Sequence, residues 1–209
     1  MSDALIVVDV QNDFLPGGAL AVAGGDSIIP IVNDLIDRAP YVVLTQDWHP
    51  EGHVSFAQSH PGHQLYDVID VPGGKQVLWP VHCVQGTQGA EISRLINAVK
   101  AGAIVRKGAK RAVDSYSGFV DADGNTRSGL AGLLRERGVT RVFVCGLATD
   151  FCVSWTALDA VAAGFDTYVV TDASGAIDVN GSLSAARKAW QERGVKEIRS
   201  ADVRFEPAG

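Results

Sequence analysis

A cysteine lies at the junction between a predicted strand and a predicted helix, where a thiol could act as a nucleophile. Cys152 ends the segment Val142–Cys152, in which a Val-rich apolar run stops at Gly146 and a helical pattern begins within a few residues. Backbone N–H groups and the positive end of the dipole at a helix start favour thiolate, the nucleophilic form. The alternative is that Cys152 is a small buried core residue, the usual fate of a free cysteine.

Three further polar residues follow predicted strands and could share a site with Cys152. Asp9 comes after Leu-Ile-Val-Val, Asp47 after Val-Val-Leu-Thr-Gln, and Lys107 after Ala-Ile-Val-Arg. Because ligands of parallel α/β sheets bind at the carboxyl ends of the strands, these side chains would gather at one edge of one sheet. Taken singly, Asp9 could be a turn carboxylate and Lys107 a solvated charge, so their convergence is what indicates a site.

These residue types suit attack on a carbonyl carbon with loss of an amine. A carboxylate of raised pKa at Asp9 could take the thiol proton from Cys152 and return it to the departing amine. An ammonium group at Lys107 would stabilise the anionic forms of both neighbours. Backbone N–H groups at the start of the Cys152 helix could bind the developing oxyanion.

A second set of residues suits a metal ion and lies in the segment Gln46–Gln88, which contains all five histidines of the chain. A segment that long with little periodicity is usually functional or disordered. Asp47 and His49 point the same way in an extended chain, and a Pro-Glu-Gly turn can return His53 to the same point. His82 would be a more distant fourth ligand. One carboxylate with several imidazoles suits a divalent zinc, iron or manganese ion, whereas the alternative is a polar surface loop.

The remaining histidines and cysteines are predicted to be structural. His60 and His63 lie in the polar stretch Gln-Ser-His-Pro-Gly-His and are expected at the surface. Cys145 lies within a Val-rich strand, and Cys83 follows His82, so both are expected in the core. Three cysteines, none in a CxxC pair, argue against a disulfide framework and favour a reducing cytoplasm.

Composition is that of one ordinary globular domain over residues 1–209. The hydrophobic content is 46% and the charged content 20%, while the net charge of −6 argues against a nucleic-acid or anionic-membrane partner. No apolar run has the length of a membrane span or the flanks of a signal peptide. We therefore expect a small-molecule ligand, and the sequence leaves the oligomeric state open.

Apolar runs alternate with amphipathic segments, which predicts an α/β fold with a mostly parallel sheet and helices on both faces. The predicted strands are Leu5–Val10, Tyr41–Thr45, Ala103–Arg106, Arg141–Cys145, Thr167–Thr171 and Glu197–Arg199. The predicted helices are Asp26–Arg38, Ala90–Ala98, Ser128–Arg137, Asp150–Ala163 and Ser182–Glu192.

Six short motifs occur in an order typical of one protein family. They are Val8–Phe14, Gln46–Pro50, Trp79–Cys83, Arg106–Gly108, Ser115–Phe119 and Gly146–Val153. With these motifs the chain, from Leu5 to about Ile198, resembles the nicotinamidases of the isochorismatase-like cysteine hydrolase superfamily. The resemblance implies a single three-layer αβα domain with a six-stranded sheet, and the hydrolysis of nicotinamide, with pyrazinamide as a further candidate substrate.

The resemblance also implies roles for individual residues. It implies a catalytic triad of Asp9, Lys107 and Cys152, and a metal held by Asp47, His49, His53 and His82 that meets the pyridine nitrogen. Phe14, Trp79 and Tyr116 match positions that line the family's pocket, although Phe14 could equally be a core residue. The family further implies a cis peptide bond between Leu147 and Ala148, and an oxyanion site formed by the N–H groups of Ala148 and Cys152.

Three alternatives remain open on the sequence alone. A related amidohydrolase acting on an N-carbamoyl compound or another small amide would share the triad, but has less use for the Asp47 and histidine set. A vinyl ether hydrolase of the isochorismatase type does not need a thiol nucleophile. A binding module without turnover would be indicated by loss of Asp9, Lys107 or Cys152, and all three are present.

Overall fold

The runs rich in Val, Ile and Leu form one parallel sheet in the computed structural model, which describes residues 2–72 and 74–206. Its strands are β1 (Ser2–Val8), β2 (Val42–Asp47), β5 (Ala103–Lys107), β6 (Val139–Leu147), β7 (Asp166–Gly175) and β8 (Lys196–Ile198). Their spatial order is β5-β2-β1-β6-β7-β8, and every neighbouring pair runs parallel. All six predicted strands are confirmed, with ends that differ by a few residues.

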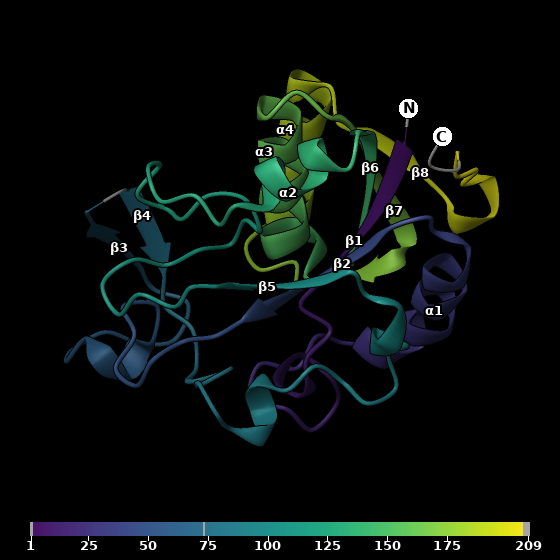
Figure 1. Cartoon of the computed structure of the whole chain (residues 1–209). Helices are drawn as coiled ribbons and strands as arrows, with labels where there is room; N and C mark the ends of the chain where they lie inside the picture. Colours follow the sequence, from purple (N-terminus) through teal and green to yellow (C-terminus); the bar gives the residue numbers. More distant parts are fainter. Residues whose placement is uncertain (1, 73, 207–209) are drawn as a thin grey trace.

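Helices cover both faces of the sheet, as predicted (Figure 1). Helix α1 (Ile29–Arg38) lies on one face, where Leu5 and Val7 of β1 point. Ala4, Ile6 and Val8 point to the other face, since side chains alternate along a strand. That face is covered by α2 (Leu130–Glu136), α3 (Ser154–Ala162) and α4 (Ser182–Arg193). The chain therefore forms a single three-layer α/β domain.

The helix predicted over Ala90–Ala98 is wrong. Only short 3-10 turns occur there, at Gln88–Ala90 and Ala98–Lys100. The backbone between them bonds to distant parts of the chain: Ser93 N–H donates to the Val10 carbonyl (2.9 Å), and Asn97 N–H donates to the Asn33 side chain (2.9 Å). These tertiary hydrogen bonds replace the helical ones that the apolar spacing predicted.

The strand order positions the site. From β1 the chain proceeds to β2 and β5 on one side of the sheet, and later to β6, β7 and β8 on the other. The connections that leave β1 and β6 therefore diverge at their carboxyl ends and open a crevice between them. Asp9 follows β1 directly and Cys152 lies five residues after the end of β6, so the two flank this crevice.

The segment after β2 contains a feature that the sequence analysis did not predict. Strands β3 (Val68–Val71) and β4 (Gly74–Val77) form an antiparallel hairpin that stands apart from the main sheet (Figure 1). The rest of the segment is irregular, and side chains of the loop after β1 hold it in place. Gln11 bonds to the Asp47 backbone through both its amide nitrogen (2.9 Å) and its amide oxygen (2.7 Å), and Asp13 accepts the N–H of Cys83 (2.7 Å).

Among the residues described, no helix is both long and apolar enough to span a bilayer.

Candidate active site

A buried lysine lies at the centre of the crevice and contacts the other predicted catalytic residues. The Lys107 Nζ atom is 2.8 Å from Oδ2 of Asp9, 2.5 Å from Oδ1 of Asp47 and 3.3 Å from Sγ of Cys152. Burial opposes the charge on Lys107, but Asp47 and Asp9 outweigh it and raise the pKa of Lys107 well above its ordinary value. The structure thus brings together the three side chains that the sequence predicted to share a site, around a permanent positive charge.

The Asp9 carboxylate is held by a threonine that the sequence analysis missed. The Thr45 hydroxyl donates to Oδ1 of Asp9 (2.6 Å) and accepts the Asp9 N–H (3.2 Å), while the Asp9 backbone is left-handed with φ 48°. Oδ2 accepts no hydrogen bond of good geometry from the described residues, although the Lys107 ammonium is adjacent. Burial raises the pKa of Asp9 from 3.8 to about 6, against the opposing effect of Lys107. Oδ2 is therefore free to receive a proton.

Cys152 lies in a π-helical turn, Thr149–Val153, that leads into α3. Single π turns are frequent at functional sites. Burial raises the pKa of the Cys152 thiol well above its ordinary value, and the neighbouring Lys107 does not offset this. The helix start therefore does not suffice to form a thiolate, contrary to the first expectation from the sequence. A neighbouring base is needed to remove the thiol proton. A carboxylate oxygen of Asp9 lies within 4.8 Å of the Cys152 Sγ atom.

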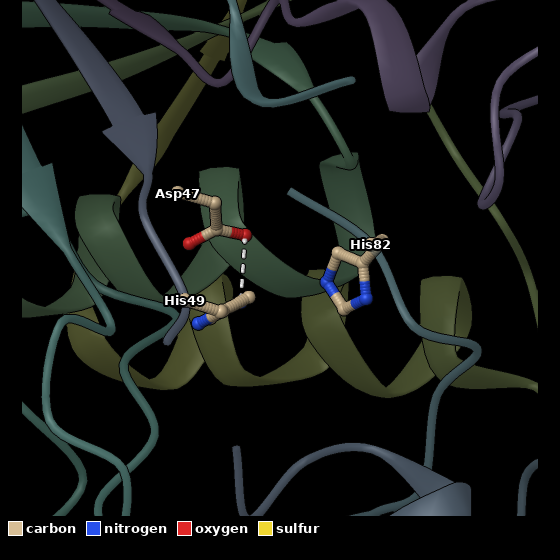
Figure 2. Close-up of side chains that lie close together, drawn as sticks. All are labelled: Asp47, His49 and His82. Atoms are coloured by element: carbon tan, nitrogen blue, oxygen red, sulfur yellow. Dashed lines mark ion pairs between the residues drawn. The ribbon is translucent and has the colours of Figure 1, made fainter. Parts of the chain in front are cut away.

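Asp47, His49 and His82 form a compact group of potential metal ligands (Figure 2). Each contributes one ligand atom, and these atoms lie within 4.8 Å of one another. Oδ2 of Asp47 is 3.6 Å from Nε2 of His49. The other ring nitrogens are already engaged: Nδ1 of His49 pairs with the Gly108 carbonyl (2.9 Å), and Nδ1 of His82 with the Pro80 carbonyl (2.7 Å). Both Nε2 atoms are thereby left for a metal, the arrangement usual for ligating histidines.

The charge states of Asp47 and His82 also suit a cation, whereas Asp47 outweighs burial at His49 and raises the pKa of that imidazole, whose proton a bound metal would displace. Burial works to raise the pKa of Asp47, but Lys107 and His49 outweigh it, so this pKa lies well below its ordinary value. Burial lowers the pKa of His82 to about 4, which leaves its ring neutral near pH 7. An anionic carboxylate and a neutral imidazole are the protonation states in which these side chains bind metals.

A glycine next to Lys107 makes room for His49. Gly108 has φ +60°, and a Cβ atom there would lie 2.6 Å from Nδ1 of His49 and closer still to Cε1. Since the Gly108 carbonyl is also the partner of Nδ1, the residue both orients the ring and leaves space for it. The Arg106–Gly108 motif therefore links Lys107, which contacts Asp9 and Cys152, to His49 of the metal-ligand group.

His53, the fourth predicted ligand, lies behind His49. Its ring stacks on that of His49 with centroids 4.1 Å apart, while its Nδ1 contacts the Ser55 hydroxyl (2.7 Å) and its Nε2 the Val113 carbonyl (3.3 Å). Together with His49 and Asp114, His53 forms a second set of residues whose potential ligand atoms lie within 4.8 Å of one another. The structure thus brings three of the four predicted ligands together directly.

Asp114 was missed in the sequence, where a lone aspartate in a polar stretch gives no signal. Its carboxylate is buried and accepts hydrogen bonds from the side-chain amide of Gln76 (2.9 Å) and from the N–H of Ser115 (2.8 Å). The two histidines that were not predicted as ligands, His60 and His63, lie apart from both groups, partly or fully exposed. Cys83 and Cys145 are buried, as expected.

A small, narrow cavity lies between Cys152 and the metal-ligand group. It is lined by Phe14, Leu20, Asp47, His49, Trp79, His82, Asp114, Tyr116, Ala148, Phe151, Cys152 and Ile177. Its walls are mostly apolar with a few polar groups, as in small-molecule sites. Because Cys152 lies at one end and the metal-ligand residues line the other, the cavity suits a small molecule with a polar group at each end.

The aromatic walls hold one another in place. The rings of Trp79 and Phe151 are perpendicular with centroids 4.8 Å apart, and Nε1 of Trp79 donates to the Tyr116 hydroxyl (2.9 Å). Phe14 packs against the ring of His82, with centroids 5.6 Å apart. All three aromatic residues predicted to line the pocket do so.

The peptide bond between Leu147 and Ala148 is cis, as the resemblance implied. Both Ala148 and Cys152 line the cavity, so their backbones border the position that a carbonyl group beside Sγ would occupy.

Comparison with known proteins agrees with this geometry. The model of the isochorismatase domain family matches residues 3–202. A nicotinamidase of Acinetobacter baylyi is 55% identical over 203 residues, which cover 96% of this chain and 94% of the relative. The solved nicotinamidase and pyrazinamidase of Acinetobacter baumanii superposes with a TM-score of 0.95 at 54% identity, covering 96% of this chain and 97% of that one.

A more distant relative was solved with a metal. The pyrazinamidase of Pyrococcus horikoshii in complex with zinc has a TM-score of 0.78 and 39% identity, covering 95% of this chain and 99% of that one. The family match covers the sheet from the second residue of β1 onward and both groups of site residues. On these findings, the chain belongs to the isochorismatase domain family.

Proposed function

We propose that this protein is an amidohydrolase that converts nicotinamide to nicotinate and ammonia through a thioester on Cys152. One observation carries the proposal: a thiol with an adjacent buried carboxylate and ammonium shares a small, aromatic-walled cavity with a group of metal-ligand residues. The first group suits an amide carbon and the second a ring nitrogen. Relatives named nicotinamidases, at up to 55% identity among those compared, support the same substrate.

In the first half-reaction, Sγ of Cys152 attacks the carboxamide carbon while the thiol proton passes to Oδ2 of Asp9. The Lys107 ammonium remains protonated and stabilises the negative charge on its neighbours. The N–H groups of Ala148 and Cys152 donate to the oxyanion. When the C–N bond breaks, Asp9 gives its proton to the departing nitrogen, which leaves as ammonia, and a nicotinoyl thioester remains.

In the second half-reaction, water attacks the thioester carbon and its proton passes to Asp9. The C–S bond then breaks, Asp9 returns the proton to the sulfur, and nicotinic acid leaves and ionises. Asp9 thus acts twice as base and twice as acid, and a carboxyl group with a pKa of about 6 is suited to both roles near neutral pH.

Asp47, His49 and His82 would hold a divalent metal ion, with His53 the further ligand predicted from the sequence. Their free Nε2 atoms, neutral imidazole at His82 and ionised carboxylate support this assignment. When bound, the metal offers a coordination position to the pyridine nitrogen and so fixes the ring. Zinc, iron and manganese all suit these ligands, and one relative was solved with zinc.

The proposal is tested with purified, metal-loaded protein and a matched pair of amides. Nicotinamide and benzamide differ only in the ring nitrogen, so we expect rapid release of ammonia from the first and much slower release from the second. Pyrazinamide keeps a nitrogen in the corresponding position and is expected to be hydrolysed. Equal rates for nicotinamide and benzamide would contradict the role of the metal group, and no release from any of the three would refute the function.

A further inference from the structure

A buried aspartate beside the nucleophile has no part in the steps above. Asp150 lies in the same π-helical turn as Cys152, and only 6% of its surface is exposed. Its Oδ1 atom accepts the N–H of Ile177 (3.0 Å). Its Oδ2 atom accepts the N–H of Asp178 (2.8 Å) and the hydroxyl of Ser182. One carboxylate thus bonds to two backbone N–H groups of the loop that follows β7 and to the first residue of α4.

That loop, residues 176–181, connects β7 to α4 and forms one wall of the cavity through Ile177. Its backbone is left-handed at Asp178 (φ 52°) and Asn180 (φ 53°), a conformation that Asp and Asn accept more readily than other side chains. The bonds from the Ile177 and Asp178 N–H groups to Asp150 hold the first part of the loop.

The same turn carries both the anchor and the reacting atom. Phe151 and Cys152 line the cavity immediately after Asp150, so the carboxylate fixes the position of Ile177 relative to the sulfur. A second bond joins the same two parts of the chain: Nε1 of Trp190 in α4 donates to the Ser154 hydroxyl (2.8 Å). With α4 held independently, loss of Asp150 would loosen chiefly the loop.

We propose that Asp150 is a positioning residue that sets the width of the cavity between Ile177 and Cys152 and thereby determines which ring amides are accepted. This inference rests on the proposed function, because it concerns the size of the ring. A carboxylate is required, since an asparagine would turn an NH₂ group towards either the Ile177 N–H or the Asp178 and Ser182 donors. The expected consequence is a site that admits the unsubstituted ring and rejects ring-methylated nicotinamides.

The test compares kcat/KM for nicotinamide with that for a panel of ring-methylated nicotinamides. A misfit of one methyl group in an apolar pocket changes kcat/KM by roughly 10–200-fold, so we expect Asp150→Asn to reduce the wild-type preference for nicotinamide by at least about fivefold. Ile177→Ala should reduce it similarly, and the double variant should lose little more than either single variant. Ser182→Ala removes one donor only and should shift the preference in the same direction by less.

Asp172→Asn is the matched control. Asp172 also accepts a backbone N–H (2.7 Å) and a hydroxyl (2.8 Å), both from Ser200, but it does not line the cavity. A variant that merely destabilises the fold should lower the melting temperature without changing the preference. If Asp150→Asn leaves the preference unchanged, or changes it no more than Asp172→Asn does, the inference is overturned.

Hydrogen exchange separates this inference from the proposed function. Peptides covering residues 176–182 should exchange faster in Asp150→Asn and Ser182→Ala, and at the wild-type rate in Asp172→Asn. Unchanged exchange in Asp150→Asn would refute the anchor even if nicotinamide is hydrolysed. If the wild type does not hydrolyse nicotinamide but Asp150→Asn still exchanges faster than the wild type, the proposed function fails while the anchoring role of Asp150 stays supported.

Discussion

Replacing Thr45 with valine should move the pH dependence of turnover to higher pH. The Thr45 hydroxyl donates to Oδ1 of Asp9 at 2.6 Å and so stabilises the ionised carboxylate. Valine has nearly the same shape but no hydroxyl. Its introduction favours the protonated form of Asp9, which raises the pKa of a group that must be ionised to accept the thiol proton.

The size of the shift follows from this one hydrogen bond. A hydrogen bond to a charged group contributes about 1.5–3 kcal/mol, and 1.36 kcal/mol corresponds to one pKa unit, so the shift is about 1–2 units. Because burial already raises the pKa of Asp9 to about 6, the acidic limb of kcat/KM should lie near pH 6 in the wild type. In Thr45→Val it should lie near pH 7–8, an order-of-magnitude expectation from the same bond energy.

The assay is a kcat/KM profile for nicotinamide from pH 5 to 9, since kcat/KM reports ionisation in the free enzyme. Thr45→Ser keeps a hydroxyl and should retain the wild-type limb. Thr45→Val also removes the acceptor of the Asp9 N–H (3.2 Å), so its melting temperature should be measured in parallel. An acidic limb at the same pH in Thr45→Val and wild type would refute Asp9 as the base.

Three further predictions concern the metal group and the buried charges. Gly108→Ala should weaken metal binding by about 10–100-fold in chelator competition, because the new Cβ displaces His49; Gly124→Ala, with φ +70° but open space around it, should not. Removal of the metal should weaken nicotinamide binding in calorimetry but leave benzamide binding unchanged, and equal losses would contradict ring–metal contact. Lys107→Met should lower the free energy of unfolding by about 3–5 kcal/mol, since it leaves two buried carboxylates uncompensated. The exposed ion pair between Lys196 and Asp166 provides the comparison, and removing it should change the free energy of unfolding little.

The sheet was predictable because each strand is a short apolar run bounded by polar residues or glycine. The helix predicted over Ala90–Ala98 failed for a reason outside its own sequence: its backbone bonds to Val10 and Asn33. Hairpin β3–β4 was missed because its two strands, Val-Ile-Asp-Val and Gly-Lys-Gln-Val, have only four residues each and show no regular alternation of apolar and polar residues.

The site residues likewise divide into those that the sequence could predict and those that it could not. Asp9, Lys107 and Cys152 could be predicted to converge, because each lies at or shortly after the carboxyl end of a strand. Thr45 and Asp114 could not, because a threonine within a strand or a single aspartate in a loop acquires its importance only from neighbours distant in sequence. Ionisation was the hardest property to predict: position favoured a thiolate at Cys152, whereas burial raises the pKa of Cys152 and favours the thiol.

The most direct test of the thioester pathway is to measure ammonia and nicotinate released from nicotinamide by wild type and Cys152→Ala side by side, at equal metal content. We expect equal amounts of the two products from the wild type and no turnover from the variant, with metal content and melting temperature retained. Turnover by Cys152→Ala at a rate near that of the wild type would contradict the thioester pathway. A wild-type protein that releases neither product would contradict the function itself.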